Sequence, residues 1–379
     1  MRVTISAHTR FHMFDLAEQL ASRGLLADLH TAYLASKAPV ALSPAVRTAY
    51  GTLARLLVRR RLPEGELTRA LDWQILNQFD RTVAASLRPC DVFVALSGMC
   101  LRSLAMAKRG GAKTVCERGS SHILFQQQIL REEFDRWGQP YNGPDPRVVE
   151  RELREYELCD RIAVPSEFVR RTFLERGVAP ERLLTNPYGV DVRAFHPVPS
   201  VKEDVFRILF AGTASLRKGI PYLLKAFQLL KGRNLELWLA GTIAPEVTAM
   251  IEGYRDKRIT VLGAVPRGEL YRTYGRASVT VLPSLEEGLA LVQAQSIACG
   301  VPVISTPNSG AEDLFVDGRH GFIVPPRSPE KLAAALEALI SSPELLEEMK
   351  KNCLALAESM TGWSQYGERA VAHYRGLLQ

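Results

Sequence analysis

The sequence predicts an α/β protein built from two similar halves. Short apolar runs rich in Val, Ile and Leu alternate with longer segments of helical periodicity, which is the pattern of parallel strands joined by helices. The alternation begins afresh at residues 206–212, F-R-I-L-F-A-G, after the stretch H-P-V-P at residues 196–199. Because 379 residues suffice for two complete cores, we expect one domain over residues 1–198 and a second over 199–361.

Composition narrows the class of protein. Hydrophobic residues make up 46% and charged residues 23% of the chain, and no run of about 18 apolar residues predicts a membrane-spanning helix. The first residues, M-R-V-T-I-S-A-H, are expected to form a strand rather than a signal peptide. The six cysteines form no C-x-x-C pair, which favours reduced, buried thiols in a cytoplasmic protein over disulfides or a zinc site.

The net charge of +7 is concentrated in the first half. Residues 1–200 hold 28 Lys and Arg against 22 Asp and Glu, and residues 201–379 hold 20 against 19. Nucleic acid is not an expected partner, because no nucleic-acid motif occurs and aromatic residues are not interleaved with the basic ones. An anionic membrane surface remains a candidate, at the inner face of the membrane.

The segment at residues 45–70 carries this membrane hypothesis. The segment contains several leucines together with Arg55, Arg59, Arg60 and Arg61. Basic amphipathic helices of this kind bind anionic membrane surfaces. The alternative is an ordinary surface helix with a solvated basic face.

Loops at strand ends supply the candidate site residues of the first half. After a strand at Arg2–Ser6, the loop to the first helix holds His8 and Arg10, with His12 just beyond. Ligands bind at such ends of α/β sheets, so these residues are predicted to contact a ligand. Their alternative is a solvated loop or helix end.

In the second half, the loop after residues 206–212 predicts a phosphate site. Gly212 and Thr213 lead to Arg217 and Lys218, just before a helix. A small backbone, a helix N-terminus and two cations suit a phosphate. A solvated Arg-Lys pair in a turn is the alternative.

Residues 279–314 predict a strand, a helix and a second strand with ligand-binding loops. The backbone N–H groups around Gly288 to Leu291 lie at a helix N-terminus, where a phosphate fits. Gln295 follows Glu287 by eight residues, about two helical turns, so both side chains are predicted to face one pocket and bind hydroxyl groups. Alternatively, Glu286 and Glu287 form only a solvated turn.

The stretch P-S-L-E-E-G-L-A-L-V-Q-A-Q-S-I-A-C-G-V-P-V-I-S-T at residues 283–306 resembles the retaining glycosyltransferases of family 4. These have the GT-B fold, two Rossmann-like domains facing across a cleft, and the resemblance is strongest from about Val164 to Ala311. It implies that a terminal helix at about residues 362–379 crosses back onto the first domain. The family usually has a second Glu where this chain has Gln295. A glutamine still accepts and donates hydrogen bonds, so we expect donor binding to weaken by about 1 kcal/mol rather than to disappear.

The resemblance also implies roles for individual residues. Glu287 would orient the hydroxyl groups of the donor sugar, Lys218 would neutralise the leaving diphosphate, and His122 would point at the donor sugar, which makes these three the predicted catalytic residues. His122 follows a predicted strand at residues 113–116, and its alternative role is at a helix N-terminus. The ligand predicted for His8, Arg10 and His12 would be the acceptor or the donor of the transferred sugar. The predicted donor-binding residues are Gly212, Thr213, Arg217, Lys218, Ala264, Val265, Glu287, Gly288, Leu289, Ala290, Leu291 and Gln295.

The expected activity is therefore retaining transfer of a sugar from a nucleotide-diphosphate sugar to a glycan or lipid-linked acceptor, in cell-surface polysaccharide or glycolipid assembly. The resemblance implies no cofactor and no metal. Two alternatives stay open. One is a GT-B sugar-nucleotide epimerase, against which the few acidic residues in the first-domain loops argue. The other is a non-catalytic sugar-nucleotide-binding subunit, which would neither transfer nor hydrolyse the donor.

Overall fold

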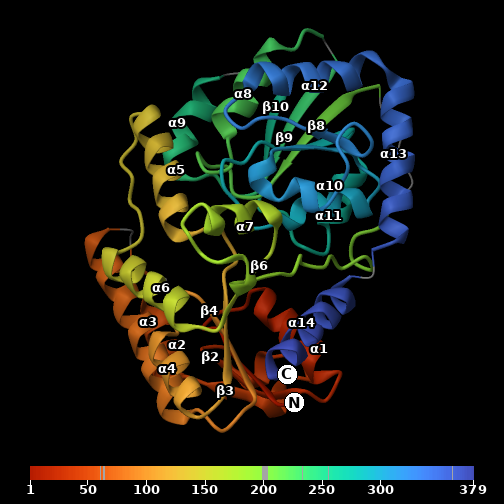
Figure 1. Cartoon of the computed structure of the whole chain (residues 1–379). Helices are drawn as coiled ribbons and strands as arrows, with labels where there is room; N and C mark the ends of the chain where they lie inside the picture. Colours follow the sequence, from red (N-terminus) through yellow and green to blue (C-terminus); the bar gives the residue numbers. More distant parts are fainter. Residues whose placement is uncertain (60, 63–64, 199–203, 233, 255, 361) are drawn as a thin grey trace.

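The computed structural model describes residues 1–59, 61–62, 65–198, 204–232, 234–254, 256–360 and 362–379, arranged around two parallel sheets (Figure 1). The first sheet has the order β3-β2-β1-β4-β5-β6-β7. Its strands are β1 (Val3–Ser6), β2 (Leu26–Thr31), β3 (Val46–Thr48), β4 (Val92–Leu96), β5 (Lys113–Glu117), β6 (Arg161–Val164) and β7 (Leu183–Thr185).

The second sheet has the order β10-β9-β8-β11-β12-β13. Its strands are β8 (Phe206–Ala211), β9 (Leu235–Ala240), β10 (Ile259–Gly263), β11 (Val279–Leu282), β12 (Val303–Ser305) and β13 (Gly321–Ile323). We call the sheet β1–β7 with its helices the first domain, and the sheet β8–β13 with its helices the second domain. The two-domain α/β fold agrees with the sequence prediction, whereas the exact limits at 198/199 and 361/362 adjoin residues outside the described part and stay a prediction.

Helices cover both faces of each sheet. Alternate residues of β4 show this, because Val92 and Val94 belong to one apolar core while Phe93 and Ala95 belong to another. The helices are α1 (His12–Ala21), α2 (Tyr50–Arg59), α3 (Glu66–Ser86), α4 (Leu101–Arg109), α5 (Ile123–Arg136), α6 (Pro146–Leu158), α7 (Glu167–Leu174), α8 (Ile220–Leu229), α9 (Pro245–Gly253), α10 (Leu270–Gly275), α11 (Leu291–Ala298), α12 (Pro329–Ser341), α13 (Pro343–Glu358) and α14 (Trp363–Leu378). Among the described residues, none of these helices has the length and apolar character needed to cross a bilayer.

The terminal helix α14 packs on α1 of the first domain, as Figure 1 shows beside the two chain ends. Tyr366, Ala370 and Tyr374 are buried in the core that contains Phe14 and Leu20. The chain therefore passes between the domains twice, and Gly189 meets Gly362 where the two passes cross. A Cβ atom on Gly189 would lie 2.4 Å from the Gly362 carbonyl oxygen.

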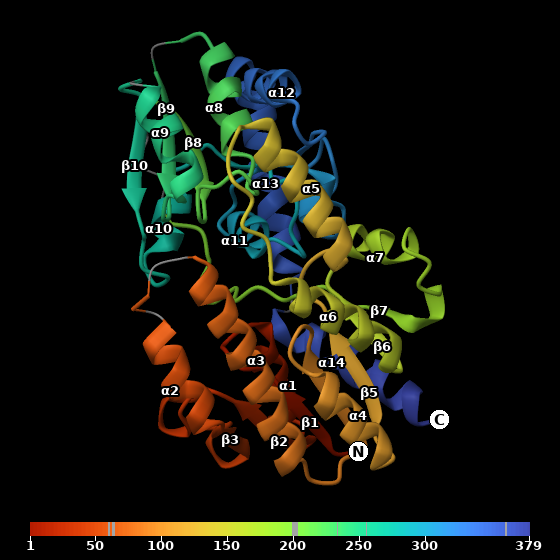
Figure 2. The ribbon, with the colours of Figure 1, turned by 90° about the vertical axis from the view of Figure 1, so that its left-hand side faces the viewer.

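The helix α5 leaves the first sheet and lies against the second domain (Figure 2). Phe134 and Trp137 pack on the second-domain core. Glu133 is fully buried there and accepts hydrogen bonds from the Tyr222 hydroxyl at 2.7 Å and from Arg327 Nε at 2.8 Å. This docking holds the two domains together on one side of the cleft.

Candidate active site

The carboxyl ends of the parallel strands of both domains face each other, and two adjoining cavities lie between them. The smaller measures about 380 Å³ and the larger about 800 Å³. Both are lined by Arg118, Gln126 and Arg217, so these side chains mark the boundary between the cavities. Parallel α/β sheets bind ligands at this edge, and the position agrees with the strand-end loops singled out in the sequence.

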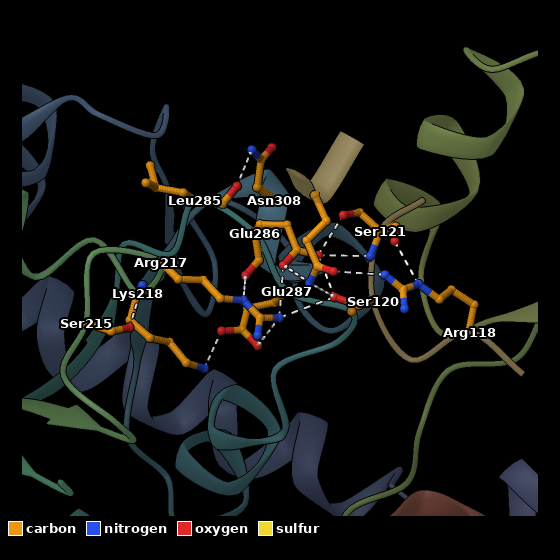
Figure 3. A network of polar contacts seen from close by, with 12 residues as sticks. Arg118, Ser120, Ser121, Ser215, Arg217, Lys218, Leu285, Glu286, Glu287 and Asn308 are labelled. Carbon is orange, nitrogen blue, oxygen red and sulfur yellow. Dashed lines mark hydrogen bonds and ion pairs between the residues drawn. The ribbon is translucent and has the colours of Figure 1, made fainter. Parts of the chain in front are cut away.

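Glu286 joins the two domains at the centre of this region (Figure 3). Its carboxylate is fully buried and accepts hydrogen bonds from Ser120 Oγ at 2.6 Å and from the backbone N–H and hydroxyl of Ser121 at 2.9 and 2.7 Å. Gln126 Nε2 donates at 3.0 Å, and Arg217 Nη2 lies at 2.9 Å. The alternative that Glu286 belongs to a solvated turn is therefore wrong.

The electrostatic balance around Glu286 favours its charged form. Burial alone would raise the pKa of the Glu286 carboxyl, but the Arg217 charge and the hydrogen bonds from Ser120 and Ser121 outweigh it and lower the pKa to about 2. The Glu286 carboxylate thus connects Ser120, Ser121 and Gln126 of the first domain to Arg217 of the second, and removing it leaves Arg217 without its main counter-charge.

The side chain of Glu287 pairs with Lys218 of the same domain, as Figure 3 shows. Its second oxygen lies 3.9 Å from Arg217 Nη2, and its backbone N–H donates to the Asn308 carbonyl at 2.9 Å. The side chains of Glu287 and Lys218 are 13% and 19% exposed, so the ion pair is largely shielded from solvent. The structure thus brings two of the three predicted catalytic residues together.

Two glycines permit the close approach of these loops. Gly219 has φ +72°, and a Cβ atom there would lie 2.0 Å from the Pro283 carbonyl oxygen. A Cβ atom on Gly288 would lie 2.0 Å from the Gly119 carbonyl oxygen of the first domain. Any larger residue at either position would push the loop after β8 or the loop after β11 out of place.

The remaining predicted donor residues lie on neighbouring strand ends. Helix α11 starts at Leu291 without a side-chain cap, and Leu289 and Leu291 line the smaller cavity. An uncapped helix start leaves backbone N–H groups available to an anion. The neighbouring loops are closely packed, since a Cβ atom on Gly241 would meet the Gly212 carbonyl oxygen at 1.9 Å.

Thr213, Ala264 and Val265 follow β8 and β10, and Gln295 lies on α11. The Thr213 hydroxyl is 3.1 Å from the Thr242 hydroxyl. Gln295 accepts a hydrogen bond from the Tyr274 hydroxyl at 3.2 Å. The contact that the structure gives to Gln295 is therefore within the second domain, and its shared pocket with Glu287 stays a prediction.

His122 lies at the N-cap of α5, which is its alternative role. Its Nδ1 accepts the Leu124 N–H at 3.2 Å, and its ring packs against Tyr156 and Phe173 with centroids 5.2 and 4.9 Å away. Burial, with the charges of Arg118 and Arg176, lowers the pKa of His122 to about 4. These contacts account for the ring without a ligand, so its catalytic role stays a prediction.

Arg118 is the residue that borders both cavities at this strand end. It directly follows β5, whereas His122 is five residues past the strand and already caps the next helix. Arg118 pairs with Glu152 at 2.8 Å and donates to the Ser121 carbonyl at 2.9 Å. The Glu152 charge outweighs burial and raises the pKa of Arg118. No role was assigned to Arg118 from the sequence.

The three predicted acceptor-side residues separate in the structure. His12 lines the smaller cavity, stacks on Tyr188 at 4.5 Å and has Nε2 3.5 Å from Glu117. His8 faces Phe79, with ring centroids 6.1 Å apart, and burial lowers its pKa to about 4. Arg10 is exposed. Among the three, His12 is thus the one that borders a cavity.

Sequence reasoning missed the loop at residues 139–144, which forms one wall of the larger cavity. The run G-Q-P-Y-N-G-P at residues 138–144 is the signal that could have found it, because glycine, proline and an aromatic residue together are typical of a structured binding loop. It also missed Ser120 and Ser121 as partners of Glu286, from which they are separated by more than 160 residues.

The two sheets, the cleft and the returning helix define a GT-B protein. Sucrose-phosphate synthase from Thermosynechococcus elongatus superposes with a TM-score of 0.76 at 20% identity, covering 100% of this chain and 99% of that one. Anabaena HepE, solved in complex with UDP-glucose, superposes with a TM-score of 0.68 at 14% identity, covering 99% of this chain and 100% of that one. These likenesses confirm the predicted fold.

Residues 191–354 match the family model described as "Glycosyl transferases group 1". A D-inositol 3-phosphate glycosyltransferase of Pseudarthrobacter chlorophenolicus is 30% identical over 258 residues, covering 62% of this chain and 61% of the relative. The chain thus spans about three-fifths of that relative's length. A D-inositol 3-phosphate glycosyltransferase of Catenulispora acidiphila is 24% identical over 394 residues, covering 97% of this chain and 90% of the relative. Residues 191–354 are therefore a transferase domain of the glycosyltransferase type.

Proposed function

We propose that the protein is a glycosyltransferase that moves a sugar from a nucleotide-diphosphate sugar to a glycan or lipid-linked acceptor, with retention of the anomeric configuration. The observation that carries the proposal is the ion pair of Glu287 and Lys218 next to the uncapped start of α11, where Leu289 and Leu291 line a cavity that both domains form. The family match over residues 191–354 supports the same activity.

The second domain would hold the donor. The diphosphate would lie against the backbone N–H groups at the start of α11. It would also replace Glu287 as the partner of the Lys218 ammonium, since these two side chains pair with each other in the free protein. Glu287 would then accept hydrogen bonds from sugar hydroxyl groups. Backbone at Ala264 and Val265 would contact the base, and Gln295 the ribose. The UDP-glucose complex of HepE makes UDP the first nucleotide to test.

Catalysis would depend on cations placed beside the phosphate group that becomes negatively charged during the reaction. As the bond between sugar and diphosphate breaks, negative charge grows on the leaving phosphate, and Lys218 and Arg217 stand at the loop that would hold it. With these two cations in place we expect no requirement for a metal. The acceptor hydroxyl oxygen would form a bond to the anomeric carbon on the same face from which the diphosphate leaves, which preserves the anomeric configuration. The bond from that carbon to the diphosphate would break, and the departing phosphate oxygen would take the proton of the hydroxyl.

A membrane-borne acceptor is the second part of the proposal. Helix α2 exposes Tyr50, Leu57 and Val58, and Arg55 is exposed on the same helix. Arg59 instead pairs with Asp72 of α3 at 2.7 Å, and its side chain is 16% exposed. Arg60, one of the arginines that motivated the idea, lies outside the described residues. Apolar and basic side chains on one exposed helix would suit an anionic bilayer surface, and the protein would then work in the cytoplasm at the inner face of the membrane.

Liposome co-sedimentation tests this second part. The wild type should sediment with vesicles containing phosphatidylserine, and a variant with Arg59, Arg60 and Arg61 changed to Ser should sediment less. Equal behaviour of both proteins, or no binding by either, would remove the membrane proposal and leave the donor proposal untouched.

Thermal stabilisation by UDP, GDP, ADP and dTDP without metal tests the donor site. One nucleotide at 100 times its Kd should stabilise the wild type by about 2.7 kcal/mol. The effect should be lost in Lys218→Ala and kept in Lys350→Ala, which removes a surface ion pair with Glu347. If no nucleotide stabilises the wild type, the glycosyltransferase proposal is wrong for this chain.

A further inference from the structure

The wall of the larger cavity contains many apolar residues, which a site for a purely polar ligand would not need. It lies between α5, the loop at residues 139–144, α6, the loop after β8 and the start of α9. Its apolar lining residues are Ile123, Leu130, Phe134, Pro140, Tyr141, Pro144, Val148 and Pro245. With a volume of about 800 Å³ it is also in the range of cavities that take ligands larger than one sugar ring.

The apolar residues extend away from the boundary with the smaller cavity. Ile123, Leu130 and Phe134 occupy positions i, i+7 and i+11 of α5 and therefore share one face of the helix. At 1.5 Å per residue, this stripe is about 16 Å long. Arg118 and Gln126 lie near its Ile123 end, so the cavity is polar where it meets the smaller cavity and apolar farther along α5.

The predicted donor residues leave most of this cavity unoccupied. Among the described residues, its lining includes Arg217 and Ser215 from the phosphate loop but not Ala264, Val265 or Gln295. Leu289 and Leu291, at the start of α11, line the smaller cavity instead. A donor held by those groups would present its reactive end at the boundary, within reach of a molecule bound in the larger cavity.

We propose that the larger cavity binds the acceptor, and that this acceptor is amphiphilic. Its hydroxyl-bearing end lies at Arg118, Gln126 and Arg217, and an apolar chain or ring lies along Leu130 and Phe134. The proposal rests on the proposed glycosyltransferase function and names the acceptor class for that site. It moves the acceptor from the loop of His8 and Arg10 to α5 and the loop at residues 139–144.

Alkyl and aryl glycosides test this directly. The probes are n-octyl, phenyl and methyl β-D-glucopyranoside, titrated below the critical micelle concentration by calorimetry, without nucleotide and again with UDP. We expect the octyl or the phenyl glucoside to bind at least tenfold more tightly than the methyl glucoside. Octyl preference indicates a lipid-like chain, and phenyl preference indicates a ring-bearing acceptor.

Three variants locate the binding. Leu130→Gln makes the α5 wall polar, and Val148→Trp fills the cavity from α6, so each should reduce the preference over methyl glucoside at least fivefold. Leu229→Gln is the matched control, because Leu229 is exposed on α8 away from the cavity. Stabilisation by UDP, unchanged in all three variants, shows that they fold.

Two results overturn the proposal: equal affinity for all three glucosides in the wild type, or a preference that survives both Leu130→Gln and Val148→Trp. If UDP fails to bind the wild type, the donor site is refuted by a separate measurement, while the titration without nucleotide still decides whether the cavity takes an apolar group. The two failures are therefore distinguishable.

Discussion

Replacing Glu286 with Gln should loosen the contact between the domains more than any exposed ion pair does. The substitution keeps the shape of the side chain, removes the charge that Arg217 faces at 2.9 Å, and places an amide NH₂ among the donors of Ser120, Ser121 and Gln126. The Arg217 side chain is 37% exposed and keeps Glu287 at 3.9 Å, so it is not left fully buried and uncompensated. The expected loss is therefore that of weakened charge-assisted hydrogen bonds, about 1.5–3 kcal/mol, which is below the cost of breaking a fully buried ion pair.

The matched control is Glu312→Gln. Glu312 also joins the domains, through Arg171 at 2.8 Å, but both side chains are more than 40% exposed. Solvent screening limits such a pair to about 0–1 kcal/mol. A comparison of the two variants therefore separates the effect of burial from the mere presence of an ion pair between domains.

Urea denaturation and small-angle X-ray scattering provide the assay. We expect Glu286→Gln to lower the free energy of unfolding by about 1.5–3 kcal/mol, and Glu312→Gln by less than about 1 kcal/mol. If the substitution weakens the association of the two domains, the radius of gyration of Glu286→Gln should also be larger than that of the wild type. Equal losses in both variants would refute the reasoning. A double-mutant cycle with Arg217→Gln should give a coupling energy of at least about 0.5 kcal/mol, as for residues in direct contact.

Two further predictions concern titratable groups in the same region. His122→Asn keeps a side-chain acceptor for the Leu124 N–H and should retain the kcat of the wild type. His122→Ala removes that acceptor and should lose about 1 kcal/mol of stability. A large fall in kcat for both variants would instead support a catalytic histidine. The stability advantage of wild type over Glu286→Gln should be full near neutral pH and shrink as pH falls from about 4.5 to about 2, because the folded pKa is depressed below the unfolded value. Denaturation at several pH values measures this, and an advantage that grows on acidification would contradict it.

The sequence was sufficient for the sheets and for the strand-end loops because both depend on local pattern. Buried parallel strands appear as short apolar runs, and β8 and β11 were predicted within a residue of their observed limits. The meeting of Lys218 and Glu287 was not predicted from the sequence; it is a consequence of the observed topology, in which β8 and β11 are neighbours in the sheet.

The position of α5 could not be predicted in the same way. Its sequence is amphipathic enough for a helix over the first sheet, but Phe134 and Trp137 find their apolar partners on α8 and α12 of the second domain. The choice between two apolar surfaces depends on contacts between residues far apart in the chain, such as Glu133 with Arg327. No periodicity in one sequence encodes that choice.

The adjacent residues Glu286 and Glu287 show how far the local pattern reaches. Both were expected at a ligand-binding turn, yet the structure gives them different partners, with Glu286 bound to first-domain serines and Glu287 to Lys218 of the second domain (Figure 3). The division has a consequence for the site. Because Glu286 fixes the turn against Ser120 and Ser121, Gly288 is pressed to Gly119 and the start of α11 is held at the cleft. The buried carboxylate of Glu286 thus fixes the turn that positions Glu287.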